Sequence, residues 1–171
     1  MNICSVCRQC YDDEVTVCAA EGHGALSRVR EGTRSQVDGY KIDLRIEPDS
    51  PGEIYKAVHL ASGKSVLIRF IKAPSQTLPS ETLQNELEKA AAVSHPNLAR
   101  IFEYGKIDED EFFAVLEDAP GESLREHLAR NSPLPERSAI RIARQSAEAL
   151  EALHNAGLVH RAVSPANISL S

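Results

Sequence analysis

Apolar and polar residues alternate in several short stretches in the middle of the chain. Residues 40–46 read Tyr-Lys-Ile-Asp-Leu-Arg-Ile, so apolar side chains occupy every second position. A period of two is typical of a strand with one buried face. Similar stretches bounded by turn residues predict further strands at residues 52–58, 63–71, 98–104 and 111–116. The middle of the chain is therefore expected to form a run of short strands.

Two other stretches show the three- and four-residue spacing of an amphipathic helix. The first begins at Ser80, a good capping residue, and continues through Leu83, Leu87, Ala90 and Ala91. The second follows Pro135, runs to about His154 and is stopped by Gly157. We interpret its apolar stripe as ordinary core packing; it consists of Ile140, Ala143, Ala147, Leu150 and Leu153. A shorter helix is expected to open at residues 121–124.

All four cysteines are concentrated near the N-terminus, at Cys4, Cys7, Cys10 and Cys18. A Cys-x2-Cys turn places two thiolates at two corners of a zinc tetrahedron, and Cys18 would supply a third. The fourth ligand stays open among Glu21, His23 and Cys10. A redox pair or free thiols are alternatives, although the βαβ pattern expected beside a redox pair is missing. We predict structural Zn²⁺ in residues 1–26, which look like the small zinc ribbons of some bacterial proteins.

The composition excludes several classes of partner. The 171 residues are 42% hydrophobic and 26% charged, as in a globular chain. The net charge is −6 and no basic run dominates, so no nucleic-acid partner is expected. The longest apolar run, residues 112–116, is far shorter than a membrane span, and the N-terminus shows no apolar signal region. We therefore expect a cytoplasmic protein without a membrane partner.

Residues 157–168 read Gly-Leu-Val-His-Arg-Ala-Val-Ser-Pro-Ala-Asn-Ile and resemble the catalytic loop of protein kinases. In that family a His-Arg-Asp triplet supplies the catalytic base, a lysine follows, and an asparagine holds a metal ion. His160, Arg161 and Asn167 match this pattern as catalytic-loop residues. The base position, however, is Ala162, and the lysine position is Ser164. The resemblance thus implies a kinase-like shell without its central carboxylate.

The resemblance extends upstream to the segments that bind nucleotide in the family. The three glycine positions of the phosphate-binding loop fall on Glu47, Asp49 and Gly52, so only Gly52 is kept. Two carboxylates would then face the phosphates, which is the wrong sign of charge. Ile54 follows on the next expected strand and would contact the nucleotide.

Further family positions fall on the third strand, the first helix and the hinge. The strand lysine that contacts phosphates is replaced by Arg69, whose planar fork does not substitute for a compact ammonium. Glu86 precedes the turn at residues 95–97 at about the family spacing, so we expect an Arg69–Glu86 ion pair. Leu116 takes the gatekeeper position, and the hinge that would meet an adenine contains Glu117 and Ala119.

The resemblance implies an α+β fold: a protein-kinase-like N-lobe, with an antiparallel sheet and one helix, followed by the start of a helical C-lobe. The expected divisions are a zinc ribbon, a linker, the N-lobe with its hinge and a partial C-lobe, at residues 1–26, 27–38, 39–119 and 120–171. The chain is shorter than a complete kinase domain and contains no Asp-Phe-Gly motif.

Two functions are compatible with these residues. The first is a catalytically impaired pseudokinase that acts as a signalling scaffold with a protein partner, or as a weak sensor of adenine nucleotide. The alternative is a serine/threonine kinase whose remaining C-lobe is missing or supplied elsewhere. For this chain, ATP with Mg²⁺ is expected to bind weakly or not at all.

Overall fold

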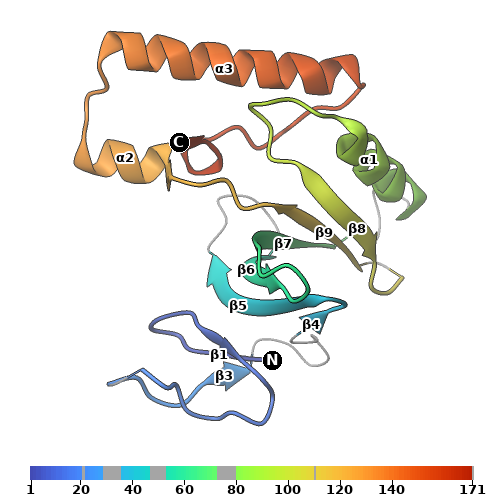
Figure 1. Ribbon diagram of the computed structural model, residues 1–171, viewed down its shortest axis with the longest axis vertical. Helices are drawn as coiled ribbons and strands as arrows, with labels where there is room; N and C mark the ends of the chain where they lie inside the picture. The colour runs from blue at the N-terminus through green and yellow to red at the C-terminus, as the bar shows by residue number, and fades with distance from the viewer. Residues whose placement is uncertain (21, 29–35, 47–52, 73–79, 110, 171) are drawn as a thin grey trace.

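The computed structural model describes residues 1–20, 22–28, 36–46, 53–72, 80–109 and 111–170 (Figure 1). The predictions made for Glu21, Glu47, Asp49 and Gly52 therefore lie outside the described residues. The chain forms a small N-terminal unit, a central sheet with one helix, and a pair of helices followed by the C-terminal segment.

The central sheet has six antiparallel strands in the order β4-β5-β6-β7-β9-β8. This confirms the expected kinase-like sheet. The strands are β4 (Gln36–Val37), β5 (Tyr40–Ile46), β6 (Glu53–His59), β7 (Ser65–Lys72), β8 (Ile101–Lys106) and β9 (Glu111–Glu117). The strand predicted at 98–104 begins later, at Ile101, because the Leu98 amide donates a 3.0 Å hydrogen bond to the His95 carbonyl and holds that segment in a turn.

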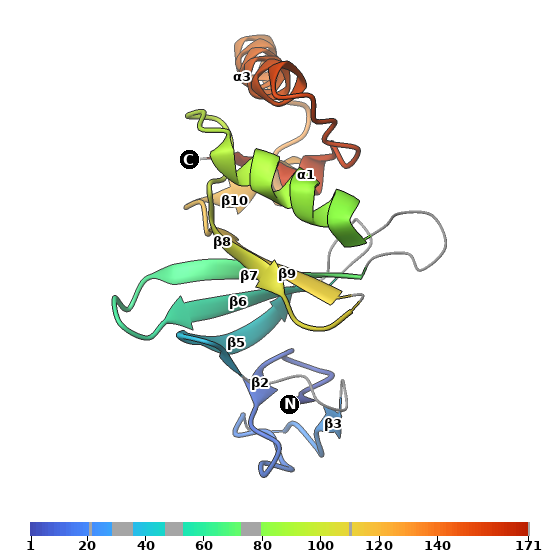
Figure 2. The ribbon, with the colours of Figure 1, turned by 90° about the vertical axis from the view of Figure 1, so that its right-hand side faces the viewer.

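Each face of the sheet buries a separate apolar cluster. On one face, helix α1 (Ser80–Ala92) packs Leu83 and Leu87 against Phe112 and Ala114 of β9. On the other face, Tyr55, Ile68 and Val115 are fully buried. The two faces are visible in Figure 2, where α1 lies on one side of the sheet and the N-terminal unit on the other.

The N-terminal unit is a three-stranded sheet in the order β2-β1-β3, formed by β1 (Asn2–Ile3), β2 (Cys10–Tyr11) and β3 (Ser27–Arg28). It does not pack by itself. Met1, Ile3 and Cys10 are buried in the same cluster as Tyr55 of the central sheet. A ribbon of this size has too little apolar surface for a core of its own, so it shares the core of its neighbour.

Both ends of the stretch expected to be a linker are paired strands. β3 pairs with β1, and β4 pairs with β5, so residues 27–28 extend the ribbon and residues 36–37 extend the central sheet. The domain divisions at residues 26 and 38 remain predictions.

The C-terminal part contains α2 (Leu124–Arg130), α3 (Glu136–Asn155) and the short η1 (Pro165–Asn167). Ser123 caps α2: its hydroxyl accepts from the Glu126 amide, and the Glu126 carboxylate accepts from the Ser123 amide. The flanking β10 (Glu122–Ser123) pairs with β11 (Ser169–Leu170). No helix of the described part of the chain has the length and apolarity needed to cross a bilayer.

The interpretation of the α3 stripe as core is only partly right. Ile140 is 60% exposed, and Ala143 and Ala147 are also exposed, whereas Ala149 is buried. The apolar arc of α3 is wider than the surface that its described neighbours cover. Periodicity identifies an apolar face of a helix, but it does not show how much of that face finds a partner.

Candidate functional sites

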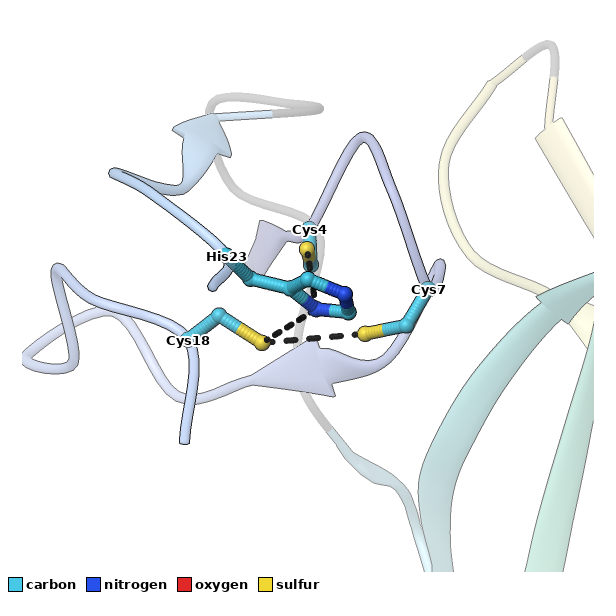
Figure 3. A group of neighbouring side chains, drawn as sticks. All are labelled: Cys4, Cys7, Cys18 and His23. Atoms are coloured by element: carbon cyan, nitrogen blue, oxygen red, sulfur yellow. Dashed lines mark hydrogen bonds between the residues drawn. The ribbon is translucent and has the colours of Figure 1, made fainter. Parts of the chain in front are cut away.

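The N-terminal unit brings three cysteines and one histidine together (Figure 3). The ligand atoms of Cys4, Cys7, Cys18 and His23 all lie within 4.8 Å of one another. His23 Nδ1 is 3.6 Å from Cys4 Sγ and 3.4 Å from Cys18 Sγ, and the Cys7 and Cys18 sulfurs are 3.6 Å apart. Zinc–sulfur bonds of 2.3 Å in a tetrahedron require sulfurs about 3.8 Å apart, so this cluster fits Zn²⁺.

The backbone around Cys4 and Cys7 explains why these two thiols converge. The Arg8 amide donates to the Cys4 carbonyl at 2.8 Å, and the Cys4 amide donates to the Gln9 carbonyl at 3.0 Å. The turn closes because Arg8 adopts a left-handed conformation with φ of 63°. We call residues 4–9 the knuckle. A second turn brings His23 back, with its amide donating to the Ala20 carbonyl at 3.3 Å.

Cys10, one of the three candidates for the fourth ligand, lies outside the cluster. Its thiol points to the Arg8 carbonyl at 3.8 Å, and the residue is 8% exposed in the shared core. Burial, with a smaller contribution from the Asp43 charge, raises the pKa of this thiol to about 11. Cys10 is therefore a core residue, and His23 is the fourth member of the cluster.

Tyr11 contacts the cluster, although the sequence did not single it out as a site residue. Its hydroxyl lies 3.2 Å from Cys18 Sγ, and the Ala20 amide donates to the same sulfur at 3.4 Å. The Tyr11 hydrogen bond is the main reason why the pKa of Cys18 falls to about 6. A thiolate stabilised in this way is the form that binds zinc.

A second candidate site is a cavity of about 420 Å³ between α1, α3 and the central sheet. Its wall is mostly apolar, and its polar side chains include Arg69 of β7, Glu86 of α1, His160 and Asn167. Leu116 of β9 also lines it. Residues predicted from separate motifs thus lie around one space.

The segment that resembles the catalytic loop is held by its own hydrogen bonds. The Ala162 amide donates to His160 Nδ1 at 3.2 Å, and the side-chain amide of Asn167 donates to the Ala162 carbonyl at 2.8 Å. Arg161 takes a left-handed conformation with φ of 57°. Because the Asn167 nitrogen is used inside the loop, its amide oxygen is the atom that could face a cation.

The charged groups of the cavity include one contact in addition to the expected pattern. The Glu86 carboxylate lies 4.0 Å from Nη2 of Arg161, a contact that the sequence did not indicate. Arg69 is partly buried, and the resulting desolvation lowers its pKa. Desolvation and the Arg69 charge also lower the pKa of His160. The Arg69–Glu86 ion pair stays a prediction.

The expected hinge lies beside a neighbouring cavity of about 300 Å³, whose wall includes Glu117, Ala119 and Asn167. Glu117 ends β9, and its amide donates to the Arg100 carbonyl at 2.8 Å. Ile54 lies opposite Arg69 in the pairing of β6 with β7. The assignment of these residues to a nucleotide site stays a prediction.

Comparison with known proteins identifies the family. The protein kinase domain family matches residues 50–171. The serine/threonine-protein kinase pkn3 of Myxococcus xanthus is 29% identical over 134 residues, which cover 75% of this chain and 24% of that protein. The serine/threonine-protein kinase PknA of Mycobacterium tuberculosis is 30% identical over 138 residues, which cover 77% of this chain and 32% of that protein.

A third relative, the probable serine/threonine-protein kinase PknB of Corynebacterium glutamicum, is 28% identical over 139 residues, with 78% of this chain and 22% of that protein covered. The chain therefore spans between about a fifth and a third of the length of these relatives. The match covers more than half of the chain and contains both β7 and the loop at His160 and Asn167. The chain belongs to the protein kinase family.

Proposed function

We propose that this chain is a catalytically impaired member of the family that acts as a signalling scaffold or a weak sensor of adenine nucleotide. The observation that carries the proposal is the loop around Ala162. The Ala162 carbonyl accepts a hydrogen bond from the Asn167 side chain, and the Ala162 amide donates one to His160. The side chain of residue 162, however, is a methyl group, whereas the family has a carboxylate there that orients the attacking hydroxyl.

The cavity offers few ligands for Mg²⁺, which supports the proposal that this ion binds weakly. Magnesium takes oxygen ligands in nearly ideal octahedral geometry. Among the described residues that line the cavity, Glu86 is the one carboxylate, and it lies beside Arg161. Asn167 offers a single amide oxygen. This donor set does not fit a catalytic magnesium ion.

Adenine contacts would then provide most of the affinity for any nucleotide. The apolar surface near Leu116 and Ala119 could cover a base, whereas Arg69, with its broad planar fork, replaces the lysine that contacts phosphates in the family. We infer that adenosine and ATP bind with similar, weak affinity.

The N-terminal ribbon is proposed to hold one Zn²⁺ through Cys4, Cys7, Cys18 and His23. All four ligands come from the chain, which is the closed coordination of a structural zinc site. The ion would stabilise a unit whose strands are only two residues long. Reduced thiols that bind a metal also support a cytoplasmic location.

The test is a titration of the purified chain with adenosine and with ATP, each with and without magnesium, followed by thermal unfolding. We expect small, similar increases in Tm for both ligands and little effect of magnesium. A large ATP-specific increase that disappears without magnesium would contradict the proposal.

The second candidate is a serine/threonine kinase that is completed by further polypeptide. The contact between the Asn167 amide nitrogen and the carbonyl of residue 162 favours it, because that contact leaves the amide oxygen for a metal. Phosphate transfer from radiolabelled ATP to a generic protein substrate would distinguish this candidate from the scaffold.

A further inference from the structure

The knuckle is attached to one edge of strand β5. The Arg45 amide of β5 donates a 3.1 Å hydrogen bond to the carbonyl of Arg8, the residue that closes the turn between the two ligands Cys4 and Cys7. The next residue, Gln9, forms an antiparallel bridge with Leu44 of β5. The ligand loop is thus joined to the strand by its backbone.

This contact lies beyond the part of β5 that pairs with β4. Among the described residues, the pairing of β4 with β5 involves Tyr40 and Lys41, and the knuckle contacts the same edge further along, at Leu44 and Arg45. On the opposite edge, the pairing of β5 with β6 shifts register between Ile42 and Leu44. Asp43 sits at that irregularity, and the side-chain amide of Gln9 donates to its carboxylate. The knuckle therefore pairs with this edge of β5 through residues 43–45, by two backbone contacts and one side-chain contact.

Side chains connect the same two parts. Met1 is 1% exposed and Ile3 is 7% exposed, and both belong to the cluster that contains Ile42 and Tyr55. Opening the ribbon would expose these side chains and the sheet surface beneath them. If the ribbon unfolds, β5 is consequently expected to lose part of its ordered structure as well.

We propose that the ribbon is a metal-responsive clamp on β5, so that binding of Zn²⁺ to Cys4, Cys7, Cys18 and His23 determines how firmly this strand is held. The inference rests on the proposed zinc site. Its significance lies in the position of β5, which ends at Ile46 immediately before the residues that are predicted to correspond to the phosphate-binding loop of the family. The supply of metal would thereby change the kinase-like part of the chain.

Amide hydrogen exchange of the whole chain tests the proposal. Zinc-loaded protein is compared with protein treated with a strong chelator under constant reducing conditions, and zinc is counted in both samples by elemental analysis. We expect exchange to accelerate at least about tenfold in the ribbon and in β5, because both lose hydrogen-bonded partners. Protection in β9 should persist and show that the rest of the sheet is folded.

Two variants complete the test. Cys7→Ser should reproduce the effect of the chelator, because it removes a ligand without touching the shared core. Val6→Ala, in the same turn at a side chain that is 65% exposed, is the matched control and should exchange like the parent protein. Faster exchange in the ribbon with unchanged exchange in β5 would overturn the clamp while leaving the zinc site intact. Absence of zinc from protein purified without chelator would overturn both.

Discussion

The hydroxyl of Tyr11 lies 3.2 Å from the sulfur of Cys18 and accepts a 3.2 Å hydrogen bond from the Ala19 amide. It therefore orients a proposed zinc ligand without being a ligand itself. Tyr11→Phe should weaken zinc binding about 10- to 100-fold, the usual effect of removing such a contact. Competition with a chromophoric chelator measures this affinity. Tyr104→Phe, far from the ribbon, should leave it unchanged; equal affinities of the Tyr11 variant and the parent would rule out the role.

The identity of the fourth ligand can be tested with a pair of substitutions. His23→Ala should lose zinc during dialysis because it removes one corner of the cluster. Cys10→Ala should keep one zinc per chain, because its sulfur lies in the shared core. Elemental analysis gives both results. Loss of zinc from the Cys10 variant and its retention in the His23 variant would reverse the assignment.

The buried Cys10 thiol predicts a change of stability at high pH. Its pKa is raised from 9.0 to about 11, so the folded chain keeps the proton after the unfolded chain has released it. The free energy of unfolding should therefore fall as the pH rises from about 9 to about 11. Urea unfolding across this range measures the slope. In Cys10→Ala, the free energy of unfolding should fall less steeply with pH, whatever the absolute stability of the variant. Equal pH dependence in the variant and the parent protein would contradict the raised pKa of Cys10.

Restoring the carboxylate alone should not restore phosphate transfer. A positioned general base contributes about 10² to 10⁴ in rate, whereas transfer also needs bound metal ions and a phosphate grip. Ala162→Asp should stay inactive, and so should its combination with Arg69→Lys. Radiolabel transfer with magnesium or manganese is the measurement. Turnover by the unmodified chain that is abolished by Asn167→Ala would refute the pseudokinase assignment.

The contact between Glu86 and Arg161 should contribute little to stability. Their side chains are 41% and 69% exposed, and the charges are 4.0 Å apart. Exposed pairs of this kind typically contribute about 0.2 to 1 kcal/mol. A double-mutant cycle with Glu86→Gln and Arg161→Gln should give a coupling energy within that range. A larger coupling energy would show that the contact holds α1 firmly against the segment that contains Arg161.

Much of the fold could be predicted because burial on one face imposes a period on the sequence. Strand β5 was predicted at residues 40–46 and is observed at Tyr40–Ile46. Its Ile42 faces the shared core. Because alternate side chains of a strand point to the same face, this burial requires apolar residues at every second position. The exposed side of α3 could not be predicted, because the exposure of Ile140 depends on which elements lie nearby.

The candidate sites were likewise predictable only where they depend on residues close together in the sequence. Local spacing predicted that Cys4 and Cys7 share a turn, because a Cys-x2-Cys segment has few ways to fold around one ion. It did not choose among Glu21, His23 and Cys10, since the role of Cys10 depends on which side chain the neighbouring sheet buries. The contact of Glu86 with Arg161 joins segments far apart in the chain, and no local pattern encodes it.

The pairing of β10 with β11 has a consequence for the folding pathway. It joins Glu122 to Leu170, and the Leu124 amide donates to the Ile168 carbonyl at 2.8 Å beside it. The intervening loop must close before these bonds can form, and the entropy of closure delays such contacts. We expect this pairing to form after the rate-limiting step. Substitutions in it should accelerate unfolding and leave the refolding rate nearly unchanged.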